Sequence, residues 1–319
     1  MTTTTTTTKP VASREAFGNA LEALGREFPH LVVLDADLSK STMSMKFAKA
    51  YPARFLEMGI QEANMLGTAA GLALCGKIPF CCSFACFISG RFDQIKMSVA
   101  YSGAAVRIIG THAGVGIGED GYSQQGLEDL GLMRSLPGML VLQPGDDVET
   151  EQMIRVLMTH RSPAYVRLTR QKLPRVHRDG YRFEPGKLDV LARHGTDALL
   201  LCTGGTVGPA VDAAARLAQG GGPRVTVGNV HTIKPIDADG IAALARECKR
   251  VITVEDHNVV GGMGSAVVEA LAERHLVPVK RLGVQDVFGE SGTPEELYRR
   301  HHLDAEGIAD DVRDWLTRR

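Results

Sequence analysis

Short apolar segments alternate with helix-like segments along almost the whole of this 319-residue chain. The expected strands lie at residues 31–34, 77–82, 106–110, 139–142, 164–168, 198–202, 225–227, 251–254 and 279–282. The expected helices lie at 13–28, 84–100, 148–158 and 207–218. Strands that alternate with helices favour a largely parallel sheet covered by helices on both faces. The predicted fold class is therefore α/β, with two consecutive domains of this kind.

One polar segment divides the alternating pattern. Residues 171–186 contain proline and arginine and have no periodicity, so they are predicted to link the two domains. We place the first domain at 11–175, the linker at 176–190 and the second domain at 191–319. The threonine run at 2–8 is of low complexity, and residues 1–10 are predicted to form a disordered tail.

Composition excludes several classes of function. The net charge of -1 offers no electrostatic attraction to nucleic acid or to a membrane surface. No apolar run reaches the ~18 residues of a membrane span, and the N-terminus lacks a secretory signal, so we expect a cytoplasmic protein. The six cysteines form no Cys-x-x-Cys pair, which favours buried, reduced thiols over zinc ligands or disulfides.

One predicted helix, which begins near Glu62, carries a single carboxylate in its first turn. Small or apolar residues follow at helical spacing, namely Ala63, Gly67, Ala70, Gly71 and Leu74. Two glycines in a helix cost about 1 kcal/mol each relative to alanine, which is tolerated where another backbone must approach closely. Glu62 is either a proton partner in a buried site or a residue that stabilises the helix start through the helix dipole. Both interpretations stay open at this point.

A long loop follows the expected strand at 106–110. Residues 110–125 contain five glycines, together with His112, Asp120 and Gln124. Glycine lets the backbone approach a ligand closely, and the polar side chains are donors and acceptors suited to a polyhydroxylated substrate. The alternative is a glycine-rich surface loop, although loops of this length in compact domains are usually functional.

Two further features are ambiguous. Gly204 and Gly205 follow the strand at 198–202 and either hold an anion at the next helix start or form a simple turn. His257 follows the strand at 251–254 and is either a site residue or a structural one.

The combination of Glu62, this loop and the strand ends resembles the C-terminal half of a transketolase, from about Ser13 to Val312. The segments that carry the resemblance are 59–65 for the cofactor glutamate, 118–121 for the substrate loop, and 232–237, 254–257 and 261–264 for the C-terminal domain. The resemblance implies a pyrimidine-binding domain at 11–175 and a transketolase C-terminal domain at 191–319. Similar domains occur in deoxyxylulose-phosphate synthases and in β subunits of 2-oxo acid dehydrogenases.

The resemblance also implies cofactors and a partner. The family uses thiamin diphosphate with Mg²⁺, held through a Gly-Asp-Gly motif and a later Asn-Asn pair. This chain has no Asn-Asn pair, and its nearest match to the first motif is Glu119-Asp120-Gly121. The chain therefore resembles the second subunit of a split transketolase, and an N-terminal transketolase subunit is expected to supply the diphosphate half and the Mg²⁺ ligands. We expect two copies of each chain to assemble as a heterotetramer (α2β2), with the sites between subunits.

Site residues are likewise carried over by resemblance. Glu62 is expected to hydrogen-bond the aminopyrimidine of the cofactor and, with His112, to be catalytic. The other expected cofactor contacts are Asp37, near the aminopyrimidine, and Phe84 and Phe87, which would pack on its ring. The expected substrate contacts are Arg14, Ser41 and Arg170 for the sugar phosphate, and His112, Asp120 and Gln124 for the hydroxyls and the carbonyl.

The sequence departs from the family pattern at one of these positions. Arg91 is an additional candidate phosphate contact, but it lies one residue away from the arginine of the mammalian-type members. Without the resemblance, Phe84 and Phe87 would also suit an ordinary core, and Arg14 and Arg170 would read as surface charges.

The predicted activity is transfer of a two-carbon ketol unit from a ketose phosphate to an aldose acceptor. Two alternatives stay open. The first is another enzyme, either a β subunit of a 2-oxo acid dehydrogenase, which would have no need of Arg14, Ser41 and Arg170, or a deoxyxylulose-phosphate-synthase-like enzyme. A non-catalytic scaffold subunit would have no need of Glu62.

Overall fold

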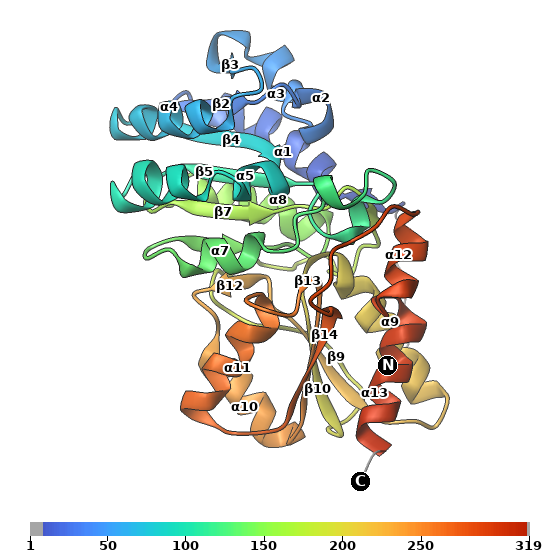
Figure 1. The fold of residues 1–319 in the computed structure, drawn as a ribbon. Coiled ribbons are helices and arrows are strands. Elements are labelled where there is room, and N and C mark those ends of the chain that lie inside the picture. Colours follow the sequence, from blue (N-terminus) through green and yellow to red (C-terminus); the bar gives the residue numbers. More distant parts are fainter. Residues whose placement is uncertain (1–8, 318–319) are drawn as a thin grey trace.

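The computed structural model describes residues 9–317 and contains two stacked layers of sheet and helix (Figure 1). The threonine run at 2–8, which the sequence predicts to be disordered, lies outside the described residues. The larger sheet has the strand order β12-β6-β7-β5-β4-β2-β3. Its strands are β2 (Leu31–Asp35), β3 (Phe55–Glu57), β4 (Ile78–Phe84), β5 (Arg107–Thr111), β6 (Leu140–Leu142), β7 (Ala164–Arg167) and β12 (Thr232–Lys234). Neighbouring strands run parallel except β12, which is antiparallel to β6.

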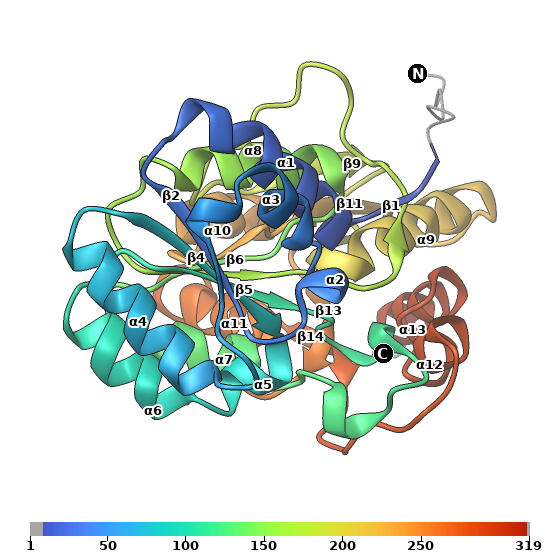
Figure 2. The same cartoon turned by 90° about the horizontal axis from the view of Figure 1, so that it is seen from above.

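Helices cover both faces of this sheet, as Figure 2 shows. One face carries α1 (Ser13–Glu27), α3 (Met45–Ala50) and α8 (Asp147–Leu157), and the other carries α4 (Glu62–Leu74), α5 (Ala85–Ser89) and α7 (Asp129–Ser135). Successive strand residues point to opposite faces. Leu31 and Val33 therefore join one apolar cluster, and Val32 and Leu34 join the other. Burial on both faces explains why these strands read as short continuous apolar runs.

The smaller sheet has the strand order β14-β13-β10-β11-β9. Its strands are β9 (Asp189–Arg193), β10 (Ala198–Cys202), β11 (Val225–Asn229), β13 (Val251–Asn258) and β14 (Val279–Val284), and only the edge strand β9 is antiparallel to its neighbour. Helices α9 (Val207–Gln219), α12 (Pro294–Arg300) and α13 (Ala305–Thr317) lie on one side, and α10 (Ala238–Cys248) and α11 (Met263–Arg274) on the other. The predicted fold class, two largely parallel sheets with helices on both faces, is confirmed.

Strand β12 joins the two halves of the chain. Thr232 pairs with Leu142 and Lys234 pairs with Val141, so a strand from the second half completes the edge of the first sheet. The Lys234 ammonium also donates to the main-chain carbonyl of Arg134 at 2.9 Å. The division of the chain at 176–190 stays a prediction, and this strand pairs across it.

A second link lies at the start of the described chain. The short strand β1 (Val11–Ala12) pairs antiparallel with β8 (Lys172–Leu173), which follows the larger sheet. Beside it, the Ser13 hydroxyl accepts the main-chain N–H of Thr169 at 2.8 Å. This pairing places the beginning of α1 next to the end of the larger sheet.

The predicted helix at 84–100 is wrong in detail. Phe84 ends strand β4, and the helical part is split into α5, α6 (Phe92–Gln94) and a π-helical segment, η2 (Ile95–Tyr101). The break falls at Gly90 and Arg91, because Arg91 has φ -116° and ψ 32°, outside the helical region. A single apolar period cannot reveal such a break.

The remaining differences are the helices α3, α7, α10, α11, α12 and α13, which the sequence analysis did not predict, and several exposed or irregular segments. The sequence did not predict the short strands β1, β3, β8, β9 and β12, which have two to five residues and lie at sheet edges. The linker has neither helix nor strand at 174–188, but it is anchored, because the imidazole of His177 lies 2.9 Å from the carboxylate of Asp146. All six cysteines are free thiols, and Cys75 is exposed. Within residues 9–317, no helix has the length and apolar character that crossing a membrane requires.

Candidate active site

Glu62 is the first residue of helix α4 and is only 5% exposed. The one hydrogen bond that its carboxylate makes within the described chain is from the Ser83 hydroxyl, at 3.5 Å. The carboxylate does not cap a main-chain N–H at the helix start, although its charge still lies at the favourable end of the helix dipole. A buried carboxylate with one long hydrogen bond retains free acceptor positions for a ligand.

An aromatic platform follows directly after Ser83. The rings of Phe84 and Phe87 are nearly parallel, with an interplanar angle of 7° and centroids 5.6 Å apart. Phe84 ends β4, and Phe87 lies one turn later in α5. The imidazole of His112 stacks on Phe84, with the two ring centroids 3.8 Å apart. Offset stacking of this kind is worth about 1 kcal/mol per pair.

His112 lies directly after β5 and has φ 58°, in the left-handed region that few non-glycine residues adopt. Its Nδ1 is 2.9 Å from the Thr111 hydroxyl, and its Nε2 is 3.3 Å from an Arg14 nitrogen. Burial, together with the positive charges of Arg14 and Arg170, lowers the pKa of His112 to about 3. The imidazole is therefore neutral at physiological pH, and it can accept a hydrogen bond and donate another.

We expect this neutral histidine to make stability fall in mild acid. The unfolded chain takes up a proton at His112 near pH 6.5, whereas the folded chain does so only near pH 3. Between these values the unfolded state binds more protons, so the contribution of His112 declines as the pH falls, by up to about 1.4 kcal/mol per pH unit. Urea unfolding of the wild type and of His112→Asn at about pH 7, 6 and 5 measures how much His112 contributes to the pH dependence of the free energy of unfolding. Parallel pH profiles for the two proteins would contradict it.

Two arginines come together beside His112. An Arg14 nitrogen donates to the main-chain carbonyl of Ser41 at 2.6 Å, and Arg170 lies 3.0 Å from the Glu119 carboxylate. Arg14 is half-buried and has no carboxylate partner in the described part of the chain. Burial and the neighbouring charge of Arg170 lower the pKa of Arg14. Arg14 is therefore not the solvated surface charge of the alternative interpretation, and this cluster would be stabilised by an anion.

The other predicted site residues make no hydrogen bond to this group within residues 9–317. Asp37 is exposed at φ 63°, and its main-chain N–H donates to the Glu57 carboxylate at 2.7 Å. Asp120 is exposed and Gln124 is half-buried. Arg91 is exposed, and its guanidinium donates to the main-chain carbonyl of Gly90. The structure thus brings together Arg14, the backbone of Ser41, Phe84, Phe87, His112 and Arg170, with Glu62 adjacent through Ser83.

The substrate loop is held by residues that the sequence analysis did not single out. The Asp256 carboxylate accepts the main-chain N–H groups of Val115 at 2.7 Å and Gly116 at 3.1 Å. The Tyr298 hydroxyl donates to the same carboxylate at 3.0 Å. Gly114 has φ 81°, and a Cβ there would collide with Asp256. The only sequence signal was that Asp256 lies within the 254–257 segment.

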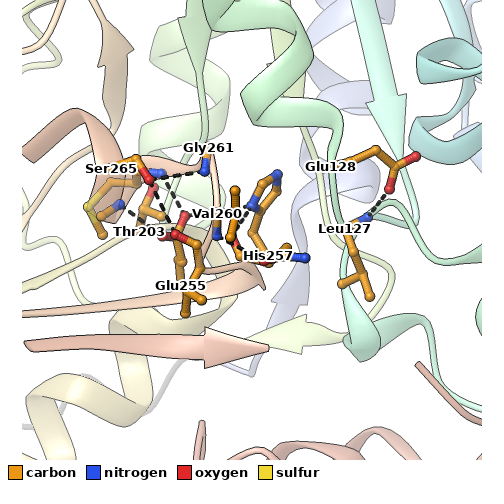
Figure 3. Close-up of polar contacts among 12 residues, drawn as sticks. Leu127, Glu128, Thr203, Glu255, His257, Val260, Gly261 and Ser265 are labelled. Carbon is orange, nitrogen blue, oxygen red and sulfur yellow. Dashed lines mark hydrogen bonds and ion pairs between the residues drawn. The ribbon is translucent and has the colours of Figure 1, made fainter. Parts of the chain in front are cut away.

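Figure 3 shows the polar contacts of two neighbouring residues in β13, Glu255 and His257. The Glu255 carboxylate accepts the main-chain N–H groups of Met263 at 2.6 Å and Gly264 at 2.8 Å, which fixes the start of α11. His257 is fully buried, with Nδ1 2.6 Å from the carbonyl of Asn258, and burial lowers its pKa to about 4. Gly204, at φ 58°, begins a short 3-10 helix, and a Cβ there would collide with the side chain of Gln143. His257 is thus a fully buried residue of the core, and its Nε2 has no hydrogen-bond partner within the described residues.

A buried ion pair lies beneath the loop. The guanidinium of Arg167 lies 2.9 Å from the Asp129 carboxylate, and both side chains are almost completely buried. The Tyr165 hydroxyl donates to Asp129 at 2.6 Å, and another Arg167 nitrogen donates to the carbonyl of Gly126 at 2.7 Å. The hydrogen-bond partners of this pair come from β7, α7 and the end of the loop, and the His257 imidazole of β13 lies 3.9 Å from the Asp129 carboxylate. The pair therefore helps to fix where the loop rejoins the sheet.

Comparisons with known proteins agree with this architecture. Residues 9–176 match the transketolase pyrimidine binding domain, and residues 186–308 match the transketolase C-terminal domain. The chain is 41% identical to a putative transketolase C-terminal section of Methanocaldococcus jannaschii, over 96% of each chain. It is 36% identical to one of the subunits of an apulose-4-phosphate transketolase of Phocaeicola vulgatus, over 97% of this chain and 98% of that one.

A solved structure is similar over nearly its whole length. It is a split gene transketolase in the form of an inactive beta4 tetramer, with a TM-score of 0.87 and 42% identity, covering 97% of this chain and 99% of that chain. The two family matches together span both sheets, and the relatives are of nearly equal length. These matches assign the chain to one family. This chain belongs to the transketolase family, as a C-terminal section that contains the pyrimidine-binding and C-terminal domains.

Proposed function

We propose that this chain supplies the pyrimidine-side half of the active site in a two-chain transketolase, which transfers a two-carbon ketol unit from a ketose phosphate to an aldose acceptor. The observation that carries the proposal is the buried carboxylate of Glu62 beside the Phe84–Phe87 platform. An acid next to a flat apolar surface fits one edge and one face of an aminopyrimidine ring.

Thiamin diphosphate fits the residues that are present. Glu62 would hold a proton at the pyrimidine ring nitrogen, Phe84 and Phe87 would support the ring, and Asp37 would lie near its amino group. Low dielectric around the buried Glu62 carboxylate strengthens such a hydrogen bond relative to water. The bound cofactor supplies the carbanion chemistry that breaks and forms the carbon–carbon bonds. The ligands of its Mg²⁺ are assigned to the partner chain in this proposal.

The arginine cluster supports a sugar phosphate as substrate. Arg14 and Arg170 would hold the phosphate together with Ser41, because guanidinium groups match phosphate oxygens in a bidentate manner. The neutral His112 would accept or donate a hydrogen bond to the substrate. Asp120 and Gln124, on the same loop, would contact its hydroxyls, and Arg91 stays a candidate for a further phosphate contact.

The outer surface of the first domain supports assembly with other chains. Ile60, two residues before α4, is 76% exposed, Leu74 at the end of α4 is 66% exposed, and Tyr101 in the adjacent η2 is 84% exposed. Gly71 is exposed on the same helix, with no atom near enough to contact a Cβ. Large exposed apolar side chains around a helix surface without side chains, such as that at Gly71, are typical of a protein–protein interface. We therefore propose a heterotetramer with two N-terminal transketolase subunits, in the cytoplasm.

Reconstitution tests this function. We expect no turnover of xylulose 5-phosphate with ribose 5-phosphate by this chain alone, even with thiamin diphosphate and Mg²⁺, because half of each pocket is absent. A similar split gene transketolase, solved as an inactive beta4 tetramer, supports this expectation. Adding the N-terminal section from the same source should restore turnover and shift the mass measured by light scattering to that of two copies of each chain.

Two outcomes would contradict the proposal. Turnover by the isolated chain would mean that no partner is needed. Turnover of pyruvate or a branched oxo acid by the reconstituted pair, and none of xylulose 5-phosphate, would favour the dehydrogenase β subunit instead.

A further inference from the structure

The side chain of Thr111 links β5 to β4 next to the Phe84–Phe87 platform. Thr111 is the last residue of β5, is fully buried, and lies opposite Phe84 in the parallel ladder. Its hydroxyl donates to the main-chain carbonyl of Ser83 at 3.3 Å, and the same oxygen lies 2.9 Å from Nδ1 of His112. A carbonyl oxygen only accepts and a hydroxyl has one proton, so that proton is directed at Ser83. Nδ1 of His112 must therefore donate in the second contact.

The other ring nitrogen leads to the same assignment independently. Nε2 of His112 lies 3.3 Å from Nη1 of Arg14, and a guanidinium has donors and no acceptor. A proton on Nε2 would point at another N–H group, so Nε2 must carry the lone pair. Nη1 has two protons, and the second is directed at the main-chain carbonyl of Ser41 at 2.6 Å. The contacts of both ring nitrogens thus require one tautomer, with the proton on Nδ1.

The orientation of the ring is fixed as well. The imidazole stacks on Phe84 with an interplanar angle of 23° between the rings, so a flat neighbour holds its plane. Turning the ring by half a revolution would bring carbon atoms to Thr111 and Arg14, and both hydrogen bonds would be lost. Burial and the charges of Arg14 and Arg170 lower the pKa of His112 to about 3, so the ring keeps its lone pair at neutral pH.

We propose that Thr111 is a positioning residue, which holds His112 as the Nδ1–H tautomer and directs the Nε2 lone pair toward Arg14. The tautomer of a histidine is selected by the hydrogen bond that its other nitrogen makes. Thr111 is held by the ladder between β4 and β5, so its hydroxyl is a rigid acceptor for Nδ1.

This tautomer narrows what His112 can contact in the substrate, a consequence that rests on the proposed function. The group that meets Nε2 must donate, as a substrate hydroxyl or the Arg14 guanidinium does. The oxygens of a carbonyl group or of a phosphate dianion only accept, and the lone pair would repel them. His112 therefore orients Arg14 and receives a hydroxyl, and it binds neither the carbonyl nor the phosphate itself.

Nitrogen NMR of the isolated chain tests the tautomer without any turnover. Magic-angle-spinning spectra of the sedimented chain with isotope-labelled histidine separate the protonated from the unprotonated ring nitrogen, and the His112 signals are those that His112→Asn lacks. We expect a protonated Nδ1 and an unprotonated Nε2 in the wild type at neutral pH. Thr111→Val removes the hydroxyl and keeps the branched shape, so it should add His112 signals with the proton on Nε2. Thr111→Ser keeps the hydroxyl and should retain the wild-type pattern.

Steady-state kinetics of the reconstituted pair provide a second readout. Thr111→Val should raise KM for a phosphorylated ketose about tenfold, the effect of one lost hydrogen bond, and should lower kcat by a smaller factor. Thr111→Ser should recover most of the lost affinity. The matched control is Thr226→Val in β11, because Thr226 is also buried and its hydroxyl donates to the main-chain carbonyl of Gly195 at 2.9 Å, in the smaller sheet. It should change neither the His112 signals nor KM.

Three results would overturn the proposal: a proton on Nε2 in the wild type, an unchanged His112 pattern in Thr111→Val, or an equal rise of KM in Thr226→Val. If Thr111→Val does not fold, Thr111→Ala replaces it with the same expectations. The spectra need neither a partner chain nor a cofactor. Failure of the reconstituted activity would leave them unchanged, so the two proposals are tested separately.

Discussion

Replacing Glu62 by glutamine is expected to lower kcat of the reconstituted enzyme by about 100- to 10,000-fold, the range for loss of a positioned proton-transfer group. Glutamine keeps the shape of the side chain and can still accept from the Ser83 hydroxyl. It cannot carry the proton that the carboxylate would share with the pyrimidine ring. Because the carboxylate is buried and makes a single hydrogen bond of 3.5 Å within the described chain, little else in the fold depends on its charge.

Steady-state assays of the pair, with thiamin diphosphate at saturation, measure this effect. Glu22→Gln is the matched control, because Glu22 is exposed on α1, far from this site in sequence and on the other face of the sheet. Light scattering should show the same assembly for both variants, so that a lost rate is not a lost partner. A Glu62→Gln enzyme with more than a tenth of the wild-type kcat would remove Glu62 from the proposed mechanism.

Asp129→Asn should destabilise the chain by about 3–5 kcal/mol, because it leaves the buried guanidinium of Arg167 without its counter-charge. Both side chains lie within a few per cent of complete burial, so water cannot replace the lost partner. The Tyr165 hydroxyl, which donates to the Asp129 carboxylate at 2.6 Å, would also lose this charged acceptor and face an amide instead. The substitution therefore removes the charge from a connected group of three side chains.

The midpoint of urea unfolding, followed by circular dichroism, measures the change in the free energy of unfolding. Glu27→Gln is the control, because it breaks an ion pair with Arg155 that is about half exposed and is screened by solvent. A change in midpoint no larger for Asp129→Asn than for Glu27→Gln would show that the buried pair is not a stabilising element.

Much of the fold could be predicted because most strands are buried on both faces. The segment 198–202, predicted as a strand, is β10 to the residue, since every side chain from Ala198 to Cys202 is buried. The predicted helix that begins at Glu62 also forms, and Met65 and Leu66 are buried on one of its faces. The spacing of apolar residues reflects which positions are buried, and in these elements the buried positions follow the period of the helix or strand.

The parts that could not be predicted depend on contacts between distant residues. Strand β12 has three residues, and its pairing with β6 joins positions about ninety apart in sequence. Asp256 holds Val115 across 141 positions, which no local pattern encodes. The site residues were carried over from the resemblance to transketolases, so the roles of Asp37, Arg91, Asp120 and Gln124 stay predictions. Their surroundings are expected to be completed by another chain.

The strand that crosses from the second half has a consequence for how the protein is made. A ribosome must synthesise residue 234 before the exposed edge of β6 can be covered. Until then the nascent larger sheet presents open main-chain donors and acceptors, which readily pair with other chains. A gene truncated after the pyrimidine-binding half would leave that edge permanently open, so the two halves are best expressed as a single polypeptide.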